Sequence, residues 1–242
     1  MIDSNDKDTH DAFVSFEQIE RENFVTNALV PGNGHYQAVK PDTFYQVTGN
    51  RYAGSKTPDA VRDLWATDRE VISWIESRYG KYDIDAAASA NNAVCEKFYS
   101  EQVNCLKIWW GSNKHIWLNP PYSHPDPFVK KAIEQMEHNN QIDMLLPGDN
   151  STAWFAEARR NAAEIIWIEA DITEIDSQEY CRTGRLAFIS GLTGKPVDGN
   201  NKGSVIFVMR KLKEGETQKT TYVSVADICP GVSRKKPRKR SV

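Results

Sequence analysis

The segment KHIWLNPPYSHPDPF, residues 114–128, runs an apolar stretch directly into two adjacent prolines. Proline lacks a backbone N–H and biases the preceding residue toward an extended conformation, so a strand that reaches Pro120 has to end there. The strand would end on Asn119-Pro120-Pro121-Tyr122, which places an amide, a backbone carbonyl and an aromatic ring in succession. The segment therefore predicts a strand that stops abruptly at a tetrapeptide of unusual chemistry.

The chemistry of this tetrapeptide suits a planar group that carries an NH₂. The side-chain carbonyl of Asn119 and the backbone carbonyl of Pro120 are hydrogen-bond acceptors, and Tyr122 offers a flat π-face. Two hydrogen bonds to the amine of a nucleobase would draw its nitrogen toward sp³ character and expose the lone pair, so the nitrogen can attack before it loses a proton. The alternative is a polyproline-like turn in which Tyr122 only fills space.

Strand and helix patterns alternate through the middle of the chain, which indicates an α/β fold with βαβ crossovers and a mostly parallel sheet. The expected strands are KYDIDAA, EKFYS, Lys114 to Leu118, QIDMLLPG, EIIWIEA, RLAFIS and SVIFVMR. The expected helices run from Thr57-Pro58 to Gly80, over DPFVKKAIEQMEHNN and around STAWFAEARRN. The closely spaced strands near the end of the chain predict an antiparallel edge. Ligands gather beyond the carboxyl ends of parallel strands, so DIDAAAS and IWLNPPY are expected to share one site.

The charge distribution says more than the net charge of −3 over 242 residues. Six Lys or Arg residues fall within the seven positions from Arg234 to Arg240, in the stretch SRKKPRKRSV. Such a run buries nothing apolar and repels itself, so it is not expected to fold alone. It predicts either an arm that neutralises nucleic-acid phosphates or a solvated tail.

Several classes of protein are not indicated. The apolar runs are far shorter than the roughly 20 residues of a membrane span, and the acidic, polar N-terminus is unlike a signal peptide, so the cytoplasm is the expected location. The four cysteines and five histidines lack metal-ligand spacing, so no metal is expected. We expect a partly ordered extension over residues 1–50, one catalytic domain over 51–230 and a basic tail over 231–242.

The motif IWLNPPYS resembles the catalytic motif of amino-methyltransferases that depend on S-adenosylmethionine. The order of KTPDAV, DIDAAASANNAVCEKFY, IWLNPPYSHPDPFVKKAI, MLLPGDNSTAWF and GRLAFIS resembles the phage-type DNA N6-adenine methyltransferases of the Dam group, over about residues 55 to 210. The resemblance implies a Rossmann-like fold with helices on both faces of the sheet. It also implies methyl transfer from S-adenosylmethionine to adenine N6 in double-stranded DNA, with GATC as a candidate target. A bacterial host cytoplasm and a phage or prophage gene follow from the same resemblance.

The resemblance also assigns roles to individual residues. Asn119, Pro120 and Tyr122 would form the catalytic clamp, and Pro121 would shape its turn. The cofactor would contact Asp85, Ala86 and Ala87, which replace the usual Gly-rich loop, together with Thr57, Pro58, Phe98 and Tyr99; Glu101 is a further candidate for the ribose. From the residues alone, a helix-capping residue is the alternative for Asp85, and Thr57-Pro58 is equally a helix start.

The expected DNA contacts lie later in the chain. Phe188 is a candidate to flank a flipped adenine, although a core phenylalanine in a strand is the alternative. The expected phosphate contacts are Lys195, Lys202, Arg234, Lys235, Lys236, Arg238, Lys239 and Arg240. Solvation of a loop is the ordinary explanation for Lys195 and Lys202. A monomer is expected, and an RNA base, a protein glutamine amide or a non-catalytic nucleic-acid-binding role are the alternative functions.

Overall fold

The computed structural model describes residues 65–190, 194–197, 202–230 and 238–240, together with the backbone of 29–32 and 35–38. The chain divides into two compact units, Met1–Thr48 and Gly49–Val242. The described part of the first unit is a hairpin in which β1 (Leu29–Gly32) and β2 (His35–Ala38) pair antiparallel. All other elements belong to the second unit.

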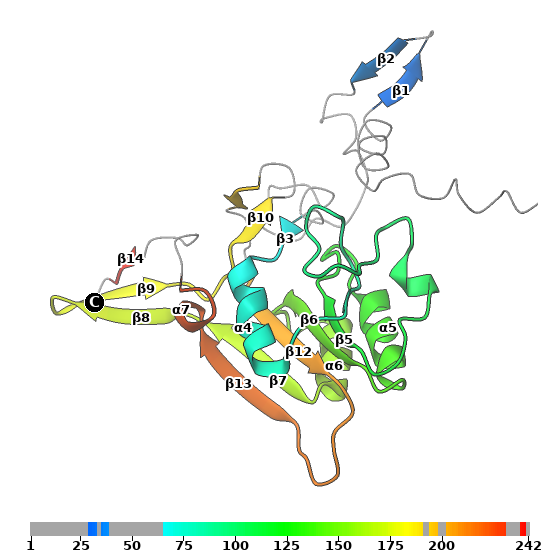
Figure 1. The fold of residues 1–242 in the computed structure, drawn as a ribbon. Coiled ribbons are helices and arrows are strands. Elements are labelled where there is room, and N and C mark those ends of the chain that lie inside the picture. The colour runs from blue at the N-terminus through cyan, green and yellow to red at the C-terminus, as the bar shows by residue number, and fades with distance from the viewer. Residues whose placement is uncertain are drawn as a thin grey trace, which may run out of the picture. The chain divides into compact units, whose positions relative to one another are not determined.

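A mixed sheet forms the centre of the second unit, with the strand order β13-β7-β12-β6-β5-β4 (Figure 1). Its strands are β4 (Ile84–Asp85), β5 (His115–Leu118), β6 (Gln141–Pro147), β7 (Glu164–Glu169), β12 (Ser204–Met209) and β13 (Lys219–Ser224). The pairs β4–β5, β5–β6 and β7–β13 are parallel, whereas β12 runs antiparallel to both of its neighbours, β6 and β7. Five expected strands are therefore present in this sheet, those of KYDIDAA, Lys114 to Leu118, QIDMLLPG, EIIWIEA and SVIFVMR, whereas EKFYS and RLAFIS are not among its strands and β13 was not expected.

The predicted antiparallel edge is wrong, because the antiparallel strand β12 lies inside the sheet. Both edge strands, β4 and β13, pair with parallel neighbours. All six residues of β12, SVIFVM, are buried, and an unbroken apolar run of this kind suits a strand that is covered on both faces. Spacing along the sequence did not reveal this position, because β12 inserts between two strands that precede it.

Helices cover both faces of the sheet, as expected. The helices are α4 (Arg69–Tyr79), α5 (Asp126–Met136), α6 (Ala153–Asn161) and α7 (Val225–Ile228). On one face, α5 and α6 pack on the alternate strand residues that include Ile116, Leu118 and Phe207. On the other face, α4 and α7 pack on the intervening residues, among them Trp117 and Ile206. The period-two alternation of each strand thus supplies two separate hydrophobic cores, and Figure 1 shows α4 and α5 on opposite sides.

Helix α4 begins later than the sequence predicted. The described chain enters it through the short strand β3 (Trp65–Ala66), so the expected continuous helix from Pro58 to Gly80 is wrong at Trp65. Asp68 caps the helix by accepting a hydrogen bond from the backbone N–H of Glu70, at 2.9 Å. Gly80 ends it as predicted, with φ of 96° and its N–H bonded to the Glu76 carbonyl.

Two smaller sheets flank the central one. In the first, β10 (Phe188–Ser190) pairs antiparallel with both β3 and β11 (Pro196–Val197). In the second, the hairpin of β8 (Asp171–Ile175) and β9 (Gln178–Arg182) is joined by β14 (Arg238–Lys239). A 3-10 turn (Cys105–Lys107) lies in the connection to β5. The hairpin was not predicted, because its sequence is polar and acidic.

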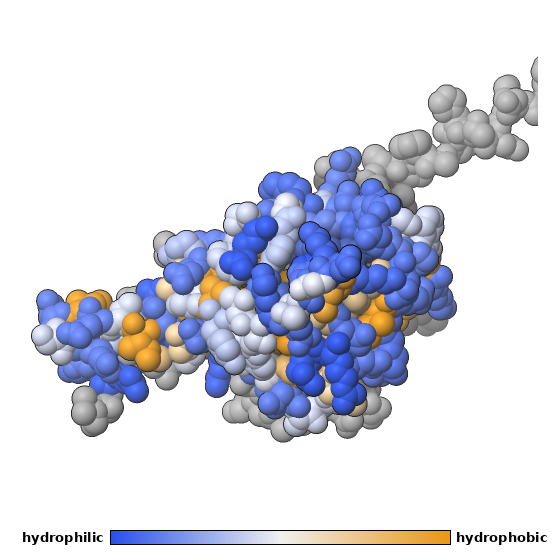
Figure 2. Space-filling view, turned by 90° about the horizontal axis from the view of Figure 1, so that it is seen from below, coloured by the Kyte–Doolittle hydropathy of each residue, from blue (hydrophilic) through white to orange (hydrophobic). Residues whose placement is uncertain are grey.

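The surface shows no broad apolar face in the view of Figure 2, where hydrophilic residues predominate and apolar ones form separate groups. One group lies toward the β8–β9 hairpin, on which Ile172 and Ile175 are about half exposed. Within the described residues, no helix is both long and apolar enough to cross a membrane.

Candidate functional site at the carboxyl ends of the parallel strands

The parallel pairing of β4 and β5 brings the two predicted site segments together. Asp85, the last residue of β4, lies opposite Trp117, and the backbone N–H of Ala86 donates to the Trp117 carbonyl at 2.9 Å. Asn119 follows Leu118 at the end of β5. Both segments therefore leave the same edge of the sheet on adjacent strands, as their positions in the sequence predicted.

Asn119 carries a buried acceptor without a donor. No group in the described part of the chain donates a hydrogen bond to its side-chain oxygen Oδ1. Pro120 behind it is buried, and the turn continues with a hydrogen bond from the His124 N–H to the Pro121 carbonyl, at 3.2 Å. Buried acceptors in proteins almost always have partners, and leaving one without a partner costs about 1–3 kcal/mol. The oxygen is therefore placed to receive a donor from a ligand.

The ring of Tyr122 contacts one buried aromatic side chain, which in turn stacks on a second. Tyr122 meets Phe188 edge to face, with ring centroids 5.8 Å apart, and Phe188 stacks on Trp65 at 6.0 Å. Phe188 is only 2% exposed. In this arrangement Phe188 serves as a buried support for Tyr122. The pairing of β3 with β10 holds Trp65 in place.

Asp85 is a buried carboxylate that organises the loop after β4. Its Oδ1 accepts from the N–H of Ala87 at 3.3 Å, and its Oδ2 accepts from the N–H of Val94 at 3.0 Å. Burial raises the pKa of Asp85 to about 6, against the lowering effect of these two hydrogen bonds and of the charge on Arg69. A buried carboxyl group with a shifted pKa, at the carboxyl ends of parallel strands, is typical of functional sites.

The loop between Asp85 and Val94 is also held from α4. The guanidinium of Arg69 donates to the carbonyls of Ala93 and Val94, at 2.6 and 3.0 Å. Sequence reasoning did not identify Arg69, because its partners are backbone atoms 24 and 25 residues away. Ala86 is fully buried and Ala87 packs against the core beside it, so small side chains line the start of this loop.

The segment EKFYS runs beside β4 but forms only an isolated parallel bridge, between Phe98 and Asp85. Tyr99 is 9% exposed and belongs to the core under α5, whereas Phe98 is half-buried and Glu101 is exposed. Adjacent residues of an extended chain face opposite sides. Of the two aromatic residues, Phe98 is therefore the one with surface left for a ligand.

A third strand end, which the sequence analysis did not select, contributes to the same edge. Gly148 follows β6, and a Cβ there would approach a ring atom of Trp167 to 2.8 Å, so a larger residue would force the Trp167 ring to shift. Asp149 then forms an ion pair with Lys202 at 2.7 Å and accepts from the Ser151 hydroxyl at 2.6 Å. The hydrogen bonds from Lys202 and Ser151 lower the pKa of Asp149.

The predicted DNA-contact residues are dispersed. Lys202 lies at the site edge in its ion pair with Asp149, and Lys195 is exposed beside β10. Lys239 and Arg240 lie on the β8–β9 hairpin, where Arg240 is 3.1 Å from Glu179. Thr57, Pro58, Arg234, Lys235 and Lys236 lie outside the described residues, as does the side chain of Arg238.

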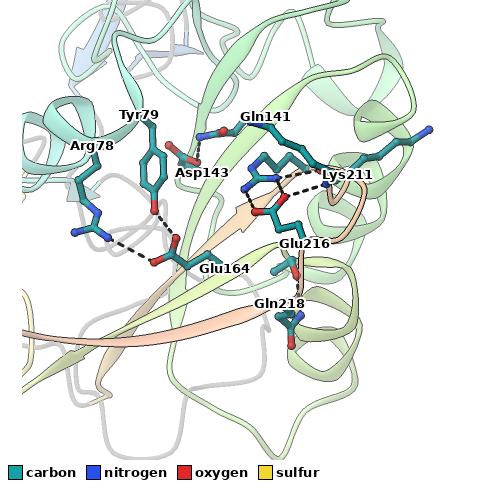
Figure 3. Close-up of polar contacts among 11 residues, drawn as sticks. Arg78, Tyr79, Gln141, Asp143, Glu164, Lys211, Glu216 and Gln218 are labelled. Carbon is teal, nitrogen blue, oxygen red and sulfur yellow. Dashed lines mark hydrogen bonds and ion pairs between the residues drawn. The ribbon is translucent and has the colours of Figure 1, made fainter.

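Two other clusters of buried polar groups have partners and lie toward the opposite ends of the strands. Asp143 is fully buried, and it contacts the His115 ring at 2.7 Å, the Tyr82 hydroxyl at 3.0 Å and the Gln141 amide at 3.1 Å. Figure 3 shows Arg78 and Tyr79 directed at Glu164; the Tyr79 hydroxyl donates to Glu164 at 2.8 Å. These clusters connect helices and strands. Their polar groups have hydrogen-bond partners, whereas Oδ1 of Asn119 has no donor among the described residues.

No group of three or more His, Cys, Asp or Glu side chains within the described ranges is arranged to hold a metal ion. The four cysteines are free thiols, of which Cys105 and Cys229 are buried.

Comparison with known proteins identifies the family. The family model for DNA N-6-adenine-methyltransferase (Dam) matches residues 54–231, which is most of the chain. The chain belongs to the Dam family of DNA adenine methyltransferases. A DNA N-6-adenine-methyltransferase of Escherichia phage T1 is 69% identical over 218 residues, which cover 90% of this chain and 92% of the relative. One of Haemophilus phage HP1 is 34% identical over 176 residues, 72% of this chain and 94% of the relative. The mixed α/β sheet is compatible with a methyltransferase fold in this family.

Proposed function

We propose that this protein transfers a methyl group from S-adenosylmethionine to N6 of adenine in double-stranded DNA. The observation that carries the proposal is the buried Oδ1 of Asn119, which has no donor among the described residues and lies three positions before the supported ring of Tyr122. An acceptor beside an aromatic face suits an aromatic amine. Membership of the Dam family supports adenine in DNA as the source of that amine.

In this proposal, the chain acts on the amine through three groups. Asn119 Oδ1 accepts one proton of N6 and the Pro120 carbonyl accepts the other, while Tyr122 stacks on the purine. The two acceptors turn the nitrogen lone pair away from conjugation with the ring. Because a neutral amide is too weak a base to remove a proton, the surplus proton leaves the nitrogen for solvent after transfer.

The residues after β4 fit the cofactor. Asp85 can accept further hydrogen bonds from an ammonium group, since a carboxylate has about four acceptor positions and two are used here. The small side chains of Ala86 and Ala87 allow close approach of a ligand to the backbone, and Phe98 supplies an apolar surface. When bound there, S-adenosylmethionine supplies the electrophilic methyl group. We also propose the Rossmann-like mode of binding, in the crevice beyond the ends of β4 and β5.

The base has to leave the duplex to reach Asn119, because N6 is paired inside DNA. Flipping costs a few kcal/mol, which stacking on Tyr122 offsets in part. Lys195, Lys202 and the terminal cations are the proposed phosphate contacts. We retain GATC as the proposed target, and sequencing of modified bases in cells that express the protein tests it. The cytoplasmic location also stays a prediction.

The decisive experiment measures incorporation of labelled methyl from S-adenosylmethionine into duplex DNA. RNA and a glutamine-containing protein serve as competing acceptors. We expect label in DNA, at adenine, and a loss of at least about 10²-fold in Asn119→Ala with the circular dichroism spectrum unchanged. Asn161→Ala is the matched control, because it removes the same side-chain amide at the end of α6, where Asn161 donates a hydrogen bond to the Glu157 carbonyl. Equal labelling by Asn119→Ala and the parent would show that the clamp is misassigned.

A further inference from the structure

The junction between β3 and α4 contacts the loop after β4 directly and the turn after β5 through Phe188. Trp65 belongs to β3, and Arg69 is the first residue of α4, four positions later. Trp65, Val94 and Tyr122 all pack against the hydrophobic core under α4. The junction, the loop that follows β4 and the turn that follows β5 therefore share one hydrophobic cluster.

Arg69 connects the junction to the loop that follows β4, where the cofactor is proposed to bind. It donates two hydrogen bonds to consecutive carbonyls, those of Ala93 and Val94, and the N–H of Val94 donates in turn to Asp85. The guanidinium thus fixes the far end of a loop whose near end starts at Asp85 and Ala87. The Arg69 side chain is exposed, so its burial contributes little to the stability of the fold. The main effect of its two hydrogen bonds is therefore to fix the position of the loop.

Trp65 connects the junction, through Phe188, to Tyr122, where the adenine is proposed to bind. Its ring lies nearly parallel to that of Phe188, with an interplanar angle of 22°, and Phe188 meets the Tyr122 ring at 82°. The pairing of Ser190 with Trp65 and of Ile189 with Ala66 sets this stack. The ring that would hold the adenine is consequently supported by a residue that does not reach the site itself.

We propose that the β3–α4 junction, residues Trp65 to Arg69, is a positioning element with two separable effects. Arg69 sets the affinity for S-adenosylmethionine through the 86–94 loop, and Trp65 sets the rate of methyl transfer through Phe188 and Tyr122. The inference rests on the proposed function, and it goes further by assigning roles to residues that contact neither substrate nor cofactor.

The test is a comparison of two variants in full-length protein. Arg69→Ala is expected to weaken binding of S-adenosylmethionine about tenfold, measured by calorimetry without DNA, with kcat changed by less than about twofold. Trp65→Leu is expected to lower kcat about tenfold with cofactor binding unchanged. Arg69→Lys keeps one donor and is expected to recover part of the affinity, and Trp65→Phe keeps a stacked ring and is expected to recover part of kcat.

The controls come from the other end of the same helix. Arg78→Ala removes an arginine that contacts Glu164, and Trp74→Leu removes a half-buried tryptophan on the same core. Both are expected to leave the two parameters within about twofold of the parent. If near-UV circular dichroism shows that Trp65→Leu is unfolded, Trp65→Met replaces it, with the same expected fall.

Parallel changes in affinity and kcat in both variants would reduce the junction to a purely structural element and overturn the inference. So would wild-type affinity in Arg69→Ala. Loss of methyl transfer in the parent protein itself would instead count against the proposed function, and calorimetry would still decide the role of Arg69.

Discussion

Asp85 is a residue that lowers the stability of the folded protein while it places a carboxyl group at the proposed site. Its folded-state pKa of about 6 lies above the ordinary value of 3.8 because the carboxyl is buried. Because the folded protein binds this proton more tightly than the unfolded chain does, protonation of Asp85 favours folding. This contribution to stability is fully present below the unfolded pKa and is lost as pH rises through the folded pKa. Keeping Asp85 ionised at neutral pH therefore costs about 3 kcal/mol of folding free energy. An ammonium group that binds to the carboxylate would recover part of this cost.

We predict that affinity for S-adenosylmethionine falls as pH drops below about 6, because protonated Asp85 cannot attract an ammonium group. Each pH unit below that point is expected to cost up to about tenfold in affinity. Calorimetric titrations between pH 5 and 8 measure this dependence. Asp85→Asn should bind weakly at every pH, whereas Asp83→Asn, which alters an exposed neighbour, should follow the parent. A flat profile in the parent would exclude Asp85 as the ammonium ligand.

Among individual residues, the sequence predicted those that lie at the ends of strands. It did not predict those whose partners are far away in the sequence. Asn119 and Asp85 were identified because their chemistry follows an apolar run directly. Arg69 was not, because its partners are backbone carbonyls of a distant loop, which no side-chain pattern records. For Phe188 the sequence left two alternatives, a contact with the flipped adenine or a place in the core, and its burial and its edge contact with Tyr122 favour the core alternative.

At the scale of elements, Gly184 marks a point where two chain segments cross without room for a side chain. A Cβ at this position would lie 2.5 Å from the carbonyl carbon of Glu169, 2.6 Å from the Ile168 oxygen and 2.9 Å from the Ala170 nitrogen. These are backbone atoms at the end of β7, so they cannot move aside as a flexible side chain can. The segment from β9 to β10 passes directly over this strand end.

We expect Gly184→Ala to destabilise the protein by about 1–3 kcal/mol, since overpacking forces the backbone to shift. Gly203→Ala is the matched control, because a Cβ there would meet no described atom within 4 Å. Chemical denaturation monitored by tryptophan fluorescence compares the two variants with the parent. Equal denaturation midpoints for the two variants and the parent would mean that the backbone near Gly184 shifts without loss of stability, and would contradict the prediction.

The elements found from sequence are those with an apolar run or an apolar stripe. The acidic β8–β9 hairpin escaped notice because both of its faces are polar or exposed, so no alternation of apolar residues marks it. The start of α4 was misplaced for a different reason. Trp65 fits a helical period, but pairing with β10 places it in a strand, and tertiary contacts override local preference.

At the scale of the whole molecule, residues 238–240, the last three basic residues of the chain, lie beside β9. Arg238 and Lys239 pair with β9, and Arg240 contacts Glu179 through both its side chain and its backbone. The basic stretch thus supplies the third strand of an acidic hairpin. DNA phosphates would have to compete with Glu179 for Arg240.

Deletion of residues 238–242 removes three cations, Arg238, Lys239 and Arg240. If each neutralises one phosphate, the slope of log K against log salt concentration should become shallower by up to about 3. Fluorescence anisotropy with a labelled duplex between 50 and 300 mM salt measures the slope. A triple variant, Lys211→Gln, Lys213→Gln and Lys219→Gln, removes the same charge near the start of β13 and should keep the parent slope. An unchanged slope after deletion would leave Arg238, Lys239 and Arg240 without a role in DNA binding.

The interior position of β12 has a consequence for how the chain folds as it is made. Strands β6 and β7 are complete by residue 169, but β12, which joins them, spans Ser204–Met209. During synthesis, the facing edges of β6 and β7 therefore remain open while about 35 more residues emerge, and open apolar edges are sites of aggregation. The yield of native protein should depend on how fast the ribosome delivers residues 170–209, and on chaperones that cover those edges in the interval.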